Sequence, residues 1–266
     1  MSTQLLIDTN RIQEWLREAS KIALSQAADR KVDLKADLTP VTLIDKQIEE
    51  FLLERITRYY PGHGILAEEG SFRSGSDFTW IIDPIDGTRA FASGLPLWGI
   101  SVGIFQRDEP YAGVFYIPMT EEMYWGTREH AFYNKQRLVP SSTVDLKSPL
   151  AFIAVPSSTH LYFEISFPRL RSLGSTTAHL AYVAQGVATA ALTRRIRIWD
   201  VAAILPLLMI SQTQLIYLSG KPFRPTDILH GEMAPEPLIA AHSSIINEVR
   251  ALVHLRRVDT TENLSA

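Results

Sequence analysis

The amino-acid sequence predicts an α+β fold in which helices and sheets pack in layers. Three observations support this prediction: two helical periodicities open the chain, a block of short apolar runs follows, and strand-like and helix-like segments alternate after about residue 150. The chain has 266 residues, of which 46% are hydrophobic and 21% charged, an ordinary globular composition. This length can bury a substantial core as one domain, residues 1–266, built from two closely joined halves.

The two N-terminal helices are predicted from the spacing of their apolar residues. In the first helix the apolar residues recur at helical spacing: Ile12, Trp15, Leu16, Ala19, Ile22 and Ala23. A second helix is expected over residues 42–60, with one apolar face formed by Ile44, Ile48, Phe51, Leu52 and Ile56. Pro61 and Gly62 end it, because neither residue continues a helix well.

Short apolar runs bounded by turn residues then predict strands. They cover residues 64–67, 79–82, 99–105, 113–117 and 123–125. After residue 150 we expect a strand at 151–155, a helix at 177–184, a strand at 187–192, a helix at 200–211, a strand at 215–218, and a last strand and helix within 238–252. Residues 135–149 are the expected connection between the first half, residues 1–134, and the second half, residues 150–266.

Composition and charge argue against several classes of function. The formal net charge of −3 provides no basic field for nucleic acid. The absence of cysteine removes disulfides, thiolate metal sites and cysteine nucleophiles, and fits a reducing compartment. The first ten residues do not read as a signal peptide, and the longest apolar run, residues 201–210, is shorter than the roughly 18 residues of a membrane helix. We therefore expect a soluble, cytoplasmic protein without a nucleic-acid or membrane partner.

Carboxylates concentrate where predicted strands end. Residues 65–67 lead into Glu68 and Glu69, and residues 80–82 lead into Asp83 and, three positions later, Asp86. Strand ends commonly carry reactive groups, because the sheet fixes them while the following loop stays reachable. Asp83 and Asp86 flank a proline, so one turn can direct both carboxylates to one point. Oxygen-only ligands favour hard cations such as magnesium or manganese.

Gly87 and Thr88 extend this pattern toward an anion. Gly87 lets the backbone approach a ligand closely, and the amides of Gly87 and Thr88 would form an anion site beside the cations. Two cations and a phosphate pocket are what in-line phosphoryl hydrolysis needs. Acidic pairs in loops more often cap helices or face solvent, so this pattern alone leaves both interpretations open.

Several motifs, in order along the chain, resemble those of the inositol monophosphatase family. The stretch Trp80-Ile-Ile-Asp-Pro-Ile-Asp-Gly-Thr88 is similar to the family's signature. The further matches are Lys35-Ala-Asp-Leu-Thr-Pro-Val-Thr42-Leu-Ile-Asp45, Glu68-Glu69, Arg171-Ser-Leu-Gly-Ser175 and Trp199-Asp200-Val-Ala-Ala203. The resemblance covers residues 35–203. It implies a single layered αβαβα sandwich of the inositol monophosphatase and fructose bisphosphatase type, and a homodimer.

The resemblance also implies roles for individual residues. The expected ligands of two or three magnesium ions, which manganese could replace, are Glu68, Asp83, the backbone carbonyl of Ile85, Asp86 and Asp200. The expected catalytic residues, which orient and help deprotonate the attacking water, are Asp45, Glu68 and Thr88. The expected substrate-binding residues are Asp86, Gly87, Thr88, Gly174, Ser175, Thr193 and Asp200. The first half would thus bind metal, and the second half would face the substrate.

The substrate side departs from the family's pattern. Thr193 stands seven residues before Asp200, where members that hydrolyse inositol phosphate often carry a glutamate. Residues 210–214 replace the family's usual Glu-Ala-Gly-Gly, so the turn there must be built differently. The stretch from Phe91 to Gly99 is more similar to the histidinol-phosphate phosphatase branch.

The implied function is magnesium-dependent hydrolysis of a small-molecule phosphate monoester: inositol phosphate, histidinol phosphate or a similar sugar or polyol phosphate. Two alternatives stay open. One is a 3′(2′),5′-bisphosphate nucleotidase, which would use the same metal motif. The other is a catalytically silent relative that binds a ligand, suggested by the altered residues near Thr193 and at 210–214.

Overall fold

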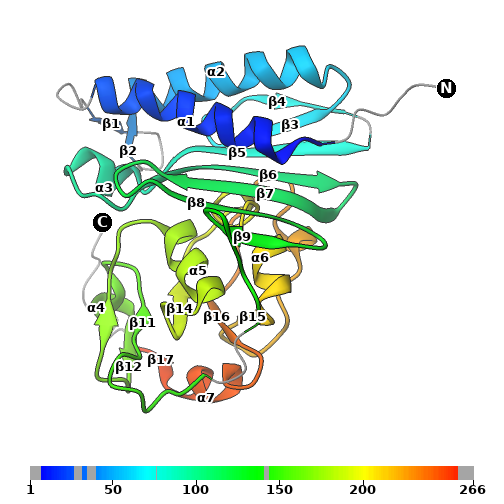
Figure 1. Cartoon of the computed structure of the whole chain (residues 1–266). Coiled ribbons are helices and arrows are strands. Elements are labelled where there is room, and N and C mark those ends of the chain that lie inside the picture. Colours follow the sequence, from blue (N-terminus) through cyan, green and yellow to red (C-terminus); the bar gives the residue numbers. More distant parts are fainter. Residues whose placement is uncertain (1–6, 27–31, 35–39, 76, 141–143, 257–266) are drawn as a thin grey trace.

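The protein folds as five alternating layers of helices and sheets (Figure 1). The computed structural model describes residues 7–26, 32–34, 40–75, 77–140 and 144–256. From the top of Figure 1 the layers are a helix pair, an eight-stranded sheet, a second helix pair, a five-stranded sheet and a short helix. The predicted αβαβα sandwich is confirmed.

The first layer is the helix pair α1 (Thr9–Ser25) and α2 (Leu43–Tyr59), as the periodicity predicts. Asp8 caps α1, because its Oδ1 accepts hydrogen bonds from the amides of Asn10 and Arg11 at 3.0 and 3.3 Å. The apolar faces of both helices are buried against the sheet below, and this burial is the main term that holds the layer in place.

The second layer is an eight-stranded sheet with the strand order β10-β9-β8-β7-β6-β5-β3-β4. Its strands are β3 (Gly64–Ala67), β4 (Phe72–Arg73), β5 (Phe78–Asp86), β6 (Gly99–Gln106), β7 (Glu109–Ile117), β8 (Glu122–Thr127), β9 (Ala131–Tyr133) and β10 (Gln136–Arg137). On β5 the side chains alternate, so that Trp80 and Ile82 face α1 and α2, whereas Ile81 faces the second helix pair. Both faces of this sheet are therefore buried.

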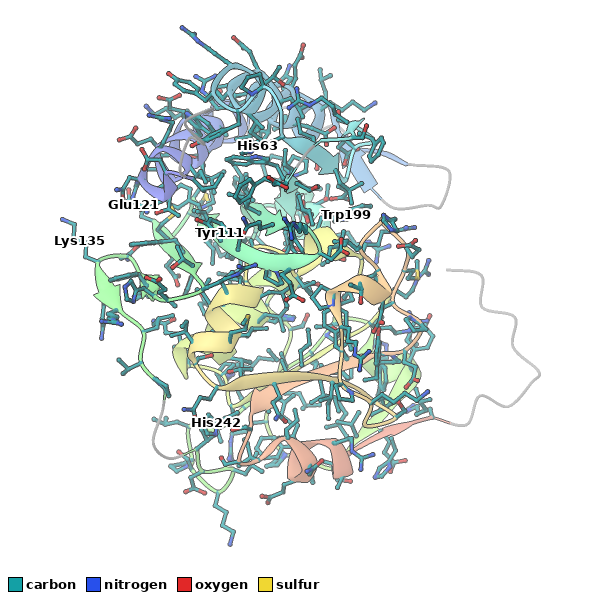
Figure 2. All side chains as sticks on the ribbon, turned by 90° about the vertical axis from the view of Figure 1, so that its right-hand side faces the viewer. His63, Tyr111, Glu121, Lys135, Trp199 and His242 are labelled. Atoms are coloured by element: carbon teal, nitrogen blue, oxygen red, sulfur yellow. The ribbon has the colours of Figure 1, made fainter. Side chains whose placement is uncertain are left out.

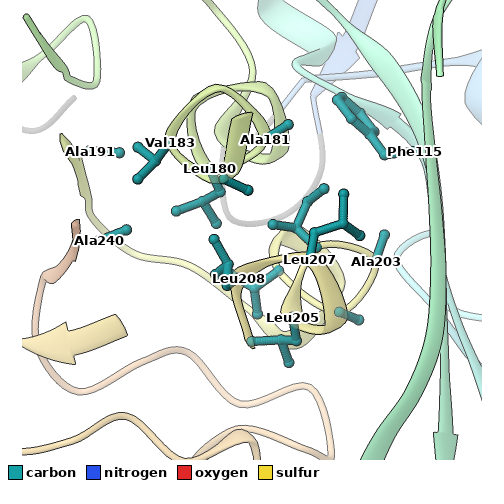
Figure 3. Packing of buried hydrophobic residues seen from close by; sticks show 14 of the residues in the cluster. Phe115, Leu180, Ala181, Val183, Ala191, Ala203, Leu205, Leu207, Leu208 and Ala240 are labelled. Carbon is teal, nitrogen blue, oxygen red and sulfur yellow. The ribbon is translucent and has the colours of Figure 1, made fainter. Parts of the chain in front are cut away.

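The remaining layers come from the second half of the chain. The helices α5 (Thr176–Gln185) and α6 (Leu205–Ile210) lie between the two sheets, where Leu180 packs with Leu207 and Leu208 (Figure 3). The second sheet has the order β13-β11-β14-β16-β15, and α7 (Ile246–Ala251) covers its far face. Its strands are β11 (Ile153–Ala154), β13 (Leu170–Arg171), β14 (Ala190–Thr193), β15 (Thr213–Tyr217) and β16 (Leu238–His242).

Short elements complete the fold. They are β1 (Val32–Leu34) paired with β2 (Pro40–Thr42), α3 (Thr88–Ala92), α4 (Thr159–Tyr162), β12 (Phe163–Ile165) paired with β17 (Val253–Leu255), and the 3₁₀ turns η1 (Ile198–Asp200) and η2 (Pro225–Asp227). Most are too short for hydrophobic periodicity to reveal them. Within the described residues, no helix combines the length and the hydropathy that crossing a membrane requires.

The predicted helix over residues 200–211 is wrong at its start. The chain forms η1 and a run of turns up to residue 204, and α6 begins only at Leu205. Pro206 explains the difference, since proline fits the first turn of a helix but would clash with a helical carbonyl four residues earlier. Asp200 therefore lies on a tight turn and not on a regular helix.

Two smaller boundaries also differ from the prediction. The strand expected from residue 187 starts at Ala190, because the amides of Val187 and Ala188 still bond to the carbonyl of Tyr182 and close the end of α5. The connection expected over residues 135–149 begins inside the first sheet, whose last strand is β10.

The turn at residues 210–214 is indeed built without glycine. Gln212 takes the left-handed conformation, with φ 58°, at the position where glycine is favoured. The hydroxyl of Ser211 donates to the carbonyl of Leu208 at 3.1 Å and lies 2.9 Å from the hydroxyl of Thr213. These contacts support a strained turn that joins α6 to β15.

Candidate metal centre

Three carboxylates converge at the junction between the two halves. Asp83 and Asp86 lie at the end of β5, and Asp200 ends η1; one oxygen of each lies within 4.8 Å of the others. The pairing of β5 with β6 is irregular between Asp83 and Asp86, which lets both side chains turn toward the same point. The structure thus brings together three of the ligands that the sequence predicts.

Asp83 is the most constrained of the three. Asp83 is 1% exposed to solvent, and its Oδ1 is buried without a hydrogen-bond partner among the described residues. Burial raises the pKa of Asp83 well above its usual value, and the carboxylates of Glu68, Asp86 and Asp200 raise this pKa further. Such a carboxylate is unfavourable without a cation, so the donor set fits hard metal ions that coordinate oxygen.

Asp86 links the first half of the molecule to the second. Its carboxylate accepts hydrogen bonds from the hydroxyl of Ser175, from the amide of Thr176 at 3.3 Å and from the amide of Thr177 at 2.7 Å. These groups form the N-terminus of α5, where a negative charge is favourable. Burial raises the pKa of Asp86, whereas these hydrogen bonds lower it.

Asp200 is held by its own turn and by α5. Its Oδ2 accepts a hydrogen bond from the amide of Arg197, and its carbonyl accepts one from the hydroxyl of Thr177 at 3.0 Å. Burial raises the pKa of Asp200 well above its usual value, and the charge of Asp86 adds to this rise. Trp199, the preceding residue, belongs to η1, which packs against β5 and β6 of the eight-stranded sheet (Trp199 is labelled in Figure 2).

A row of glycines in the first sheet allows the segment after Asp200 to pack close to this sheet. Gly103 of β6 pairs with Gly113 of β7, which pairs with Gly126 of β8. A Cβ atom on Gly103 or Gly113 would come within 2.6 Å of the carbonyl carbon of Ala202 or Ala203, respectively. A side chain at Gly103 or Gly113 would collide with these alanines, so glycine at both positions allows the segment after Asp200 to pack closely against the sheet.

A long connection between β15 and β16 covers Trp199. These strands are antiparallel neighbours, which a hairpin of two to five residues could join, yet residues 218–237 lie between them. The carbonyl of Gly231 accepts a hydrogen bond from Arg197 Nη1, and a Cβ atom on Gly231 would lie 3.2 Å from the indole of Trp199. This contact was not predicted, although the unusual length of the segment is visible once β15 and β16 are paired.

The other predicted catalytic residues come from three different elements of the first half. Glu68 follows β3, and its carboxylate raises the pKa of Asp83. The hydroxyl of Thr88 donates to the carbonyl of Ile85 at 3.1 Å, so these two predicted residues are adjacent. Asp45 is fully buried in the first turn of α2. Lys35, part of the N-terminal motif, lies outside the described residues.

Glu49 is a buried acid beside the predicted site that the sequence analysis did not single out. Its carboxylate accepts hydrogen bonds from the amides of Glu69 and Ser71, at 2.9 and 3.2 Å. It thereby fixes the loop that carries Glu68. A buried acid on the sheet-facing side of a predicted helix is the signal that could have found it.

The predicted substrate-side residues Gly174 and Ser175 lie at the start of α5, whereas Thr193 lies at the end of β14. Gly87 and Gly174 both have positive φ, 92° and 106°, and a Cβ atom on Gly87 would lie 2.8 Å from the carbonyl oxygen of Gly174. Thr193 ends β14 on the same face as Ala191, which packs toward α5. Thr193 is 1% exposed, and its hydroxyl has no hydrogen-bond partner among the described residues.

Comparisons with known proteins agree with this arrangement. The sequence model of the inositol monophosphatase family matches residues 8–251. The inositol-1-monophosphatase of Bacillus subtilis is 34% identical over 251 residues, which cover 89% of this chain and 94% of that protein. The histidinol-phosphatase of Mycobacterium tuberculosis is 31% identical over 195 residues, 67% of this chain and 74% of that protein.

A solved structure supports the same conclusion. The IMPase of Thermotoga maritima superimposes with a TM-score of 0.79 at 27% identity, covering 91% of this chain and 96% of that one. The family match spans nearly the whole chain, and the fold and the carboxylate cluster are those that the resemblance implies. This chain therefore belongs to the inositol monophosphatase family.

Proposed function

We propose that this protein is a magnesium-dependent phosphatase that hydrolyses a small-molecule phosphate monoester. The observation that carries the proposal is the convergence of Asp83, Asp86 and Asp200, with a buried oxygen of Asp83 that has no hydrogen-bond partner among the described residues. Three carboxylates this close together, two of them buried, are costly in a protein that does not bind cations. Inositol and histidinol phosphatases among the relatives support the reaction class.

The residues present fit two adjacent cation sites. Glu68, Asp83 and the carbonyl of Ile85 would hold one ion, and Asp83, Asp86 and Asp200 would hold the second. All these ligands are oxygens, which suits magnesium and, as a substitute, manganese. When bound, such ions lower the pKa of a coordinated water and stabilise negative charge on the phosphoryl and leaving oxygens.

The chain's own side chains complete the mechanism. Thr88 and Asp45 would orient the attacking water, and Glu68 would accept its proton. The hydroxyl of Thr88 lies beside the carbonyl of Ile85, close to the first cation site. A single general base supplies about 10²–10⁴ of rate acceleration, far less than phosphate monoester hydrolysis requires, so electrostatic stabilisation must supply most of it.

The substrate's alcohol half would meet Gly174, Ser175 and Thr193. Thr193 offers a neutral hydroxyl, which binds paired ring hydroxyls less strongly than a glutamate would. Inositol phosphate, histidinol phosphate and related polyol phosphates are the proposed substrates, and a bisphosphate nucleotidase is the alternative. A homodimer and a cytoplasmic location are part of the same proposal.

Activity measurements on the purified chain test the proposal. We expect hydrolysis of several monoesters with magnesium or manganese, no hydrolysis after chelation, and inhibition by excess calcium, which fits a tight octahedral site poorly. Asp200→Asn is nearly isosteric and should abolish turnover while preserving the fold, as seen by circular dichroism. Full turnover after exhaustive chelation would exclude this mechanism, and a chain inactive on every monoester would support the silent alternative.

A further inference from the structure

A cavity of about 330 Å³ adjoins the metal centre. Its wall comes from α3, from the loop that follows β11 and from residues 172–176, which lead into α5. Ser175 belongs both to this wall and to the group of donors that bind Asp86, so the cavity and the metal centre share a side chain. The volume is within the range of small-molecule pockets, about 300–1,000 Å³.

The chemistry of this wall differs from that of the metal centre. Its polar side chains are mainly hydroxyls, and neither aspartate nor glutamate is among the described residues that line it. Arg89 is the cation of the wall. His179 also lines the cavity, but burial lowers the pKa of His179 to about 4, so it is neutral at pH 7. The net charge of the wall is therefore positive, in a protein whose formal net charge is −3.

Arg89 is available to a ligand. It lies in the first turn of α3 and is exposed to solvent, and its guanidinium makes no hydrogen bond or ion pair with any described residue. The nearby amides at the start of α5 are already used, because those of Thr176 and Thr177 bind Asp86 and that of Ala178 binds Ser175. An anion in the cavity would therefore depend on Arg89.

Arg89 is also within reach of a substrate bound at the metal centre. It follows Asp86 by three residues, a span of at most about 11 Å between Cα atoms. The long arginine side chain can cover much of the remaining distance. A molecule the size of a hexose or hexitol could place a phosphate at the metal centre and a second charged group beside Arg89.

We propose that this cavity receives the alcohol half of the substrate and that Arg89 binds a second anionic group on it, a phosphate or a carboxylate. This inference rests on the proposed phosphatase function. Among its substrates it favours anionic alcohols, such as those of bisphosphates and sugar-acid phosphates, over neutral or cationic alcohols such as inositol and histidinol. A guanidinium suits this role because it binds either oxyanion through two parallel hydrogen bonds.

Three compounds with one carbon skeleton test the proposal: sorbitol 6-phosphate as the neutral reference, 6-phosphogluconate with a carboxylate, and sorbitol 1,6-bisphosphate with a second phosphate. We expect wild type to show a higher kcat/KM for one or both anionic compounds than for the reference. Arg89→Gln should lower that ratio by about ten- to hundredfold, the usual value of hydrogen bonds between charged groups. Arg89→Lys should retain part of it, and Arg107→Gln, which changes an exposed arginine in the turn between β6 and β7, should leave the ratio unchanged.

The outcomes separate this inference from the function on which it rests. A ratio that is the same in wild type and Arg89→Gln overturns the role of Arg89, whichever compound is preferred. If neither these compounds nor inositol phosphate and histidinol phosphate are turned over with magnesium, the proposed function fails. Calorimetric titration of calcium-loaded protein with sorbitol 1,6-bisphosphate and sorbitol 6-phosphate then decides the inference, which requires the bisphosphate to bind more tightly to wild type but not to Arg89→Gln.

Discussion

The two halves of the protein contribute to the candidate metal centre in different ways. In the first half, the proposed ligands Asp83 and Asp86 lie at the end of β5 and Glu68 directly follows β3, and these two strands are paired in one sheet. The second half presents Asp200 from a short turn that must dock beneath that sheet. The positions of the first-half carboxylates thus depend on local structure, whereas the position of Asp200 depends on how the two halves pack together. Changes far from any ligand should therefore disturb the second half's contribution more than the first's.

The largest effect is expected from Asp83→Asn. Loss of an outer-shell partner costs about 10–100-fold in metal affinity or activity, and loss of a shared ligand should cost more. The metal-free variant should nevertheless melt at a higher temperature than wild type at pH 7. Because the pKa of Asp83 is raised in the folded state, the folded protein binds more protons than the unfolded one, and metal-free stability falls as pH rises above about 3.8.

Asparagine does not titrate, so Asp83→Asn removes this fall in the stability of the metal-free protein with rising pH. Melting curves across pH, with and without magnesium, check both expectations. Asp77→Asn, at an exposed carboxylate just before β5, is the matched control and should change neither activity nor the pH dependence. Equal melting temperatures for metal-free Asp83→Asn and wild type at pH 7 would show that the charge of Asp83 does not destabilise the metal-free protein.

The second half should respond to pH in the opposite direction through His179. Burial lowers the pKa of His179 to about 4, and its Nε2 accepts a hydrogen bond from the amide of Leu173 at 3.0 Å. The unfolded chain binds the proton more readily, so stability is full above pH 6.5 and is lost as pH falls toward about 4. A shift of this size corresponds to a loss of up to about 3 kcal/mol.

His179→Gln tests this effect, because an amide oxygen can replace the acceptor but does not titrate in this range. Denaturant unfolding between pH 7 and pH 4 should show a flatter dependence for the variant than for wild type. His230→Gln changes an exposed histidine and should retain the wild-type slope. If the free energy of unfolding depends on pH equally in wild type and His179→Gln, His179 is not the source of the loss of stability in acid.

Gly113→Ala should separate docking from ligand chemistry. The added Cβ atom would lie 2.6 Å from a backbone carbon of Ala203, so the segment after Asp200 must move. Overpacking of this kind costs about 1–3 kcal/mol. Calorimetric magnesium titration should also show weaker binding, although no ligand has changed. Gly126→Ala is the graded control, since its nearest neighbours lie at 3.1 Å and one is the mobile end of Leu207. If both variants bind magnesium like wild type, the glycine row does not position Asp200.

The smallest effect is expected from Ser175→Ala. This serine caps α5, because its hydroxyl accepts from the amide of Ala178 and donates to Asp86. Its loss should cost about 0.5–2 kcal/mol of stability, as N-cap substitutions do. Ser158→Ala is the matched comparison, since Ser158 precedes α4 without a side-chain capping bond, and it should cost less. A chemical denaturation series on both variants measures the difference.

The parts of the structure that the sequence predicts are those fixed by local pattern. The helices over α1 and α2 follow from their apolar spacing, and Asp83 and Asp86 follow from the apolar strand that precedes them. The bonds from Ser175 and Thr177 to Asp86 cross about ninety positions of the chain, and no local pattern encodes such a pairing. The start of α6 was predictable in principle from Pro206, but the apolar run masked it.

The cavity beside Arg89 and the connection between β15 and β16, which contacts Trp199, could not be predicted from local sequence patterns either. Each depends on which loops meet after the sheets have docked. The residue types involved, serine, glycine and arginine, are ordinary loop residues that carry no periodic signal. Family resemblance supplied the ligand roles in the first half, whereas the surroundings of Asp200 required coordinates.

The glycine row also bears on how the protein can move. Gly103 and Gly113 pack directly against the backbone of Ala202 and Ala203. This contact contains no long side chains that could change rotamer to accommodate a second arrangement. Rocking of one half against the other would open a gap there and pull Asp200 away from Asp83. Hinge closure, which many two-part enzymes use to enclose a substrate, is therefore costly in this molecule. Admission of substrate and release of product are expected to involve loops at the rim, and the spacing of the three aspartates should stay constant through the catalytic cycle.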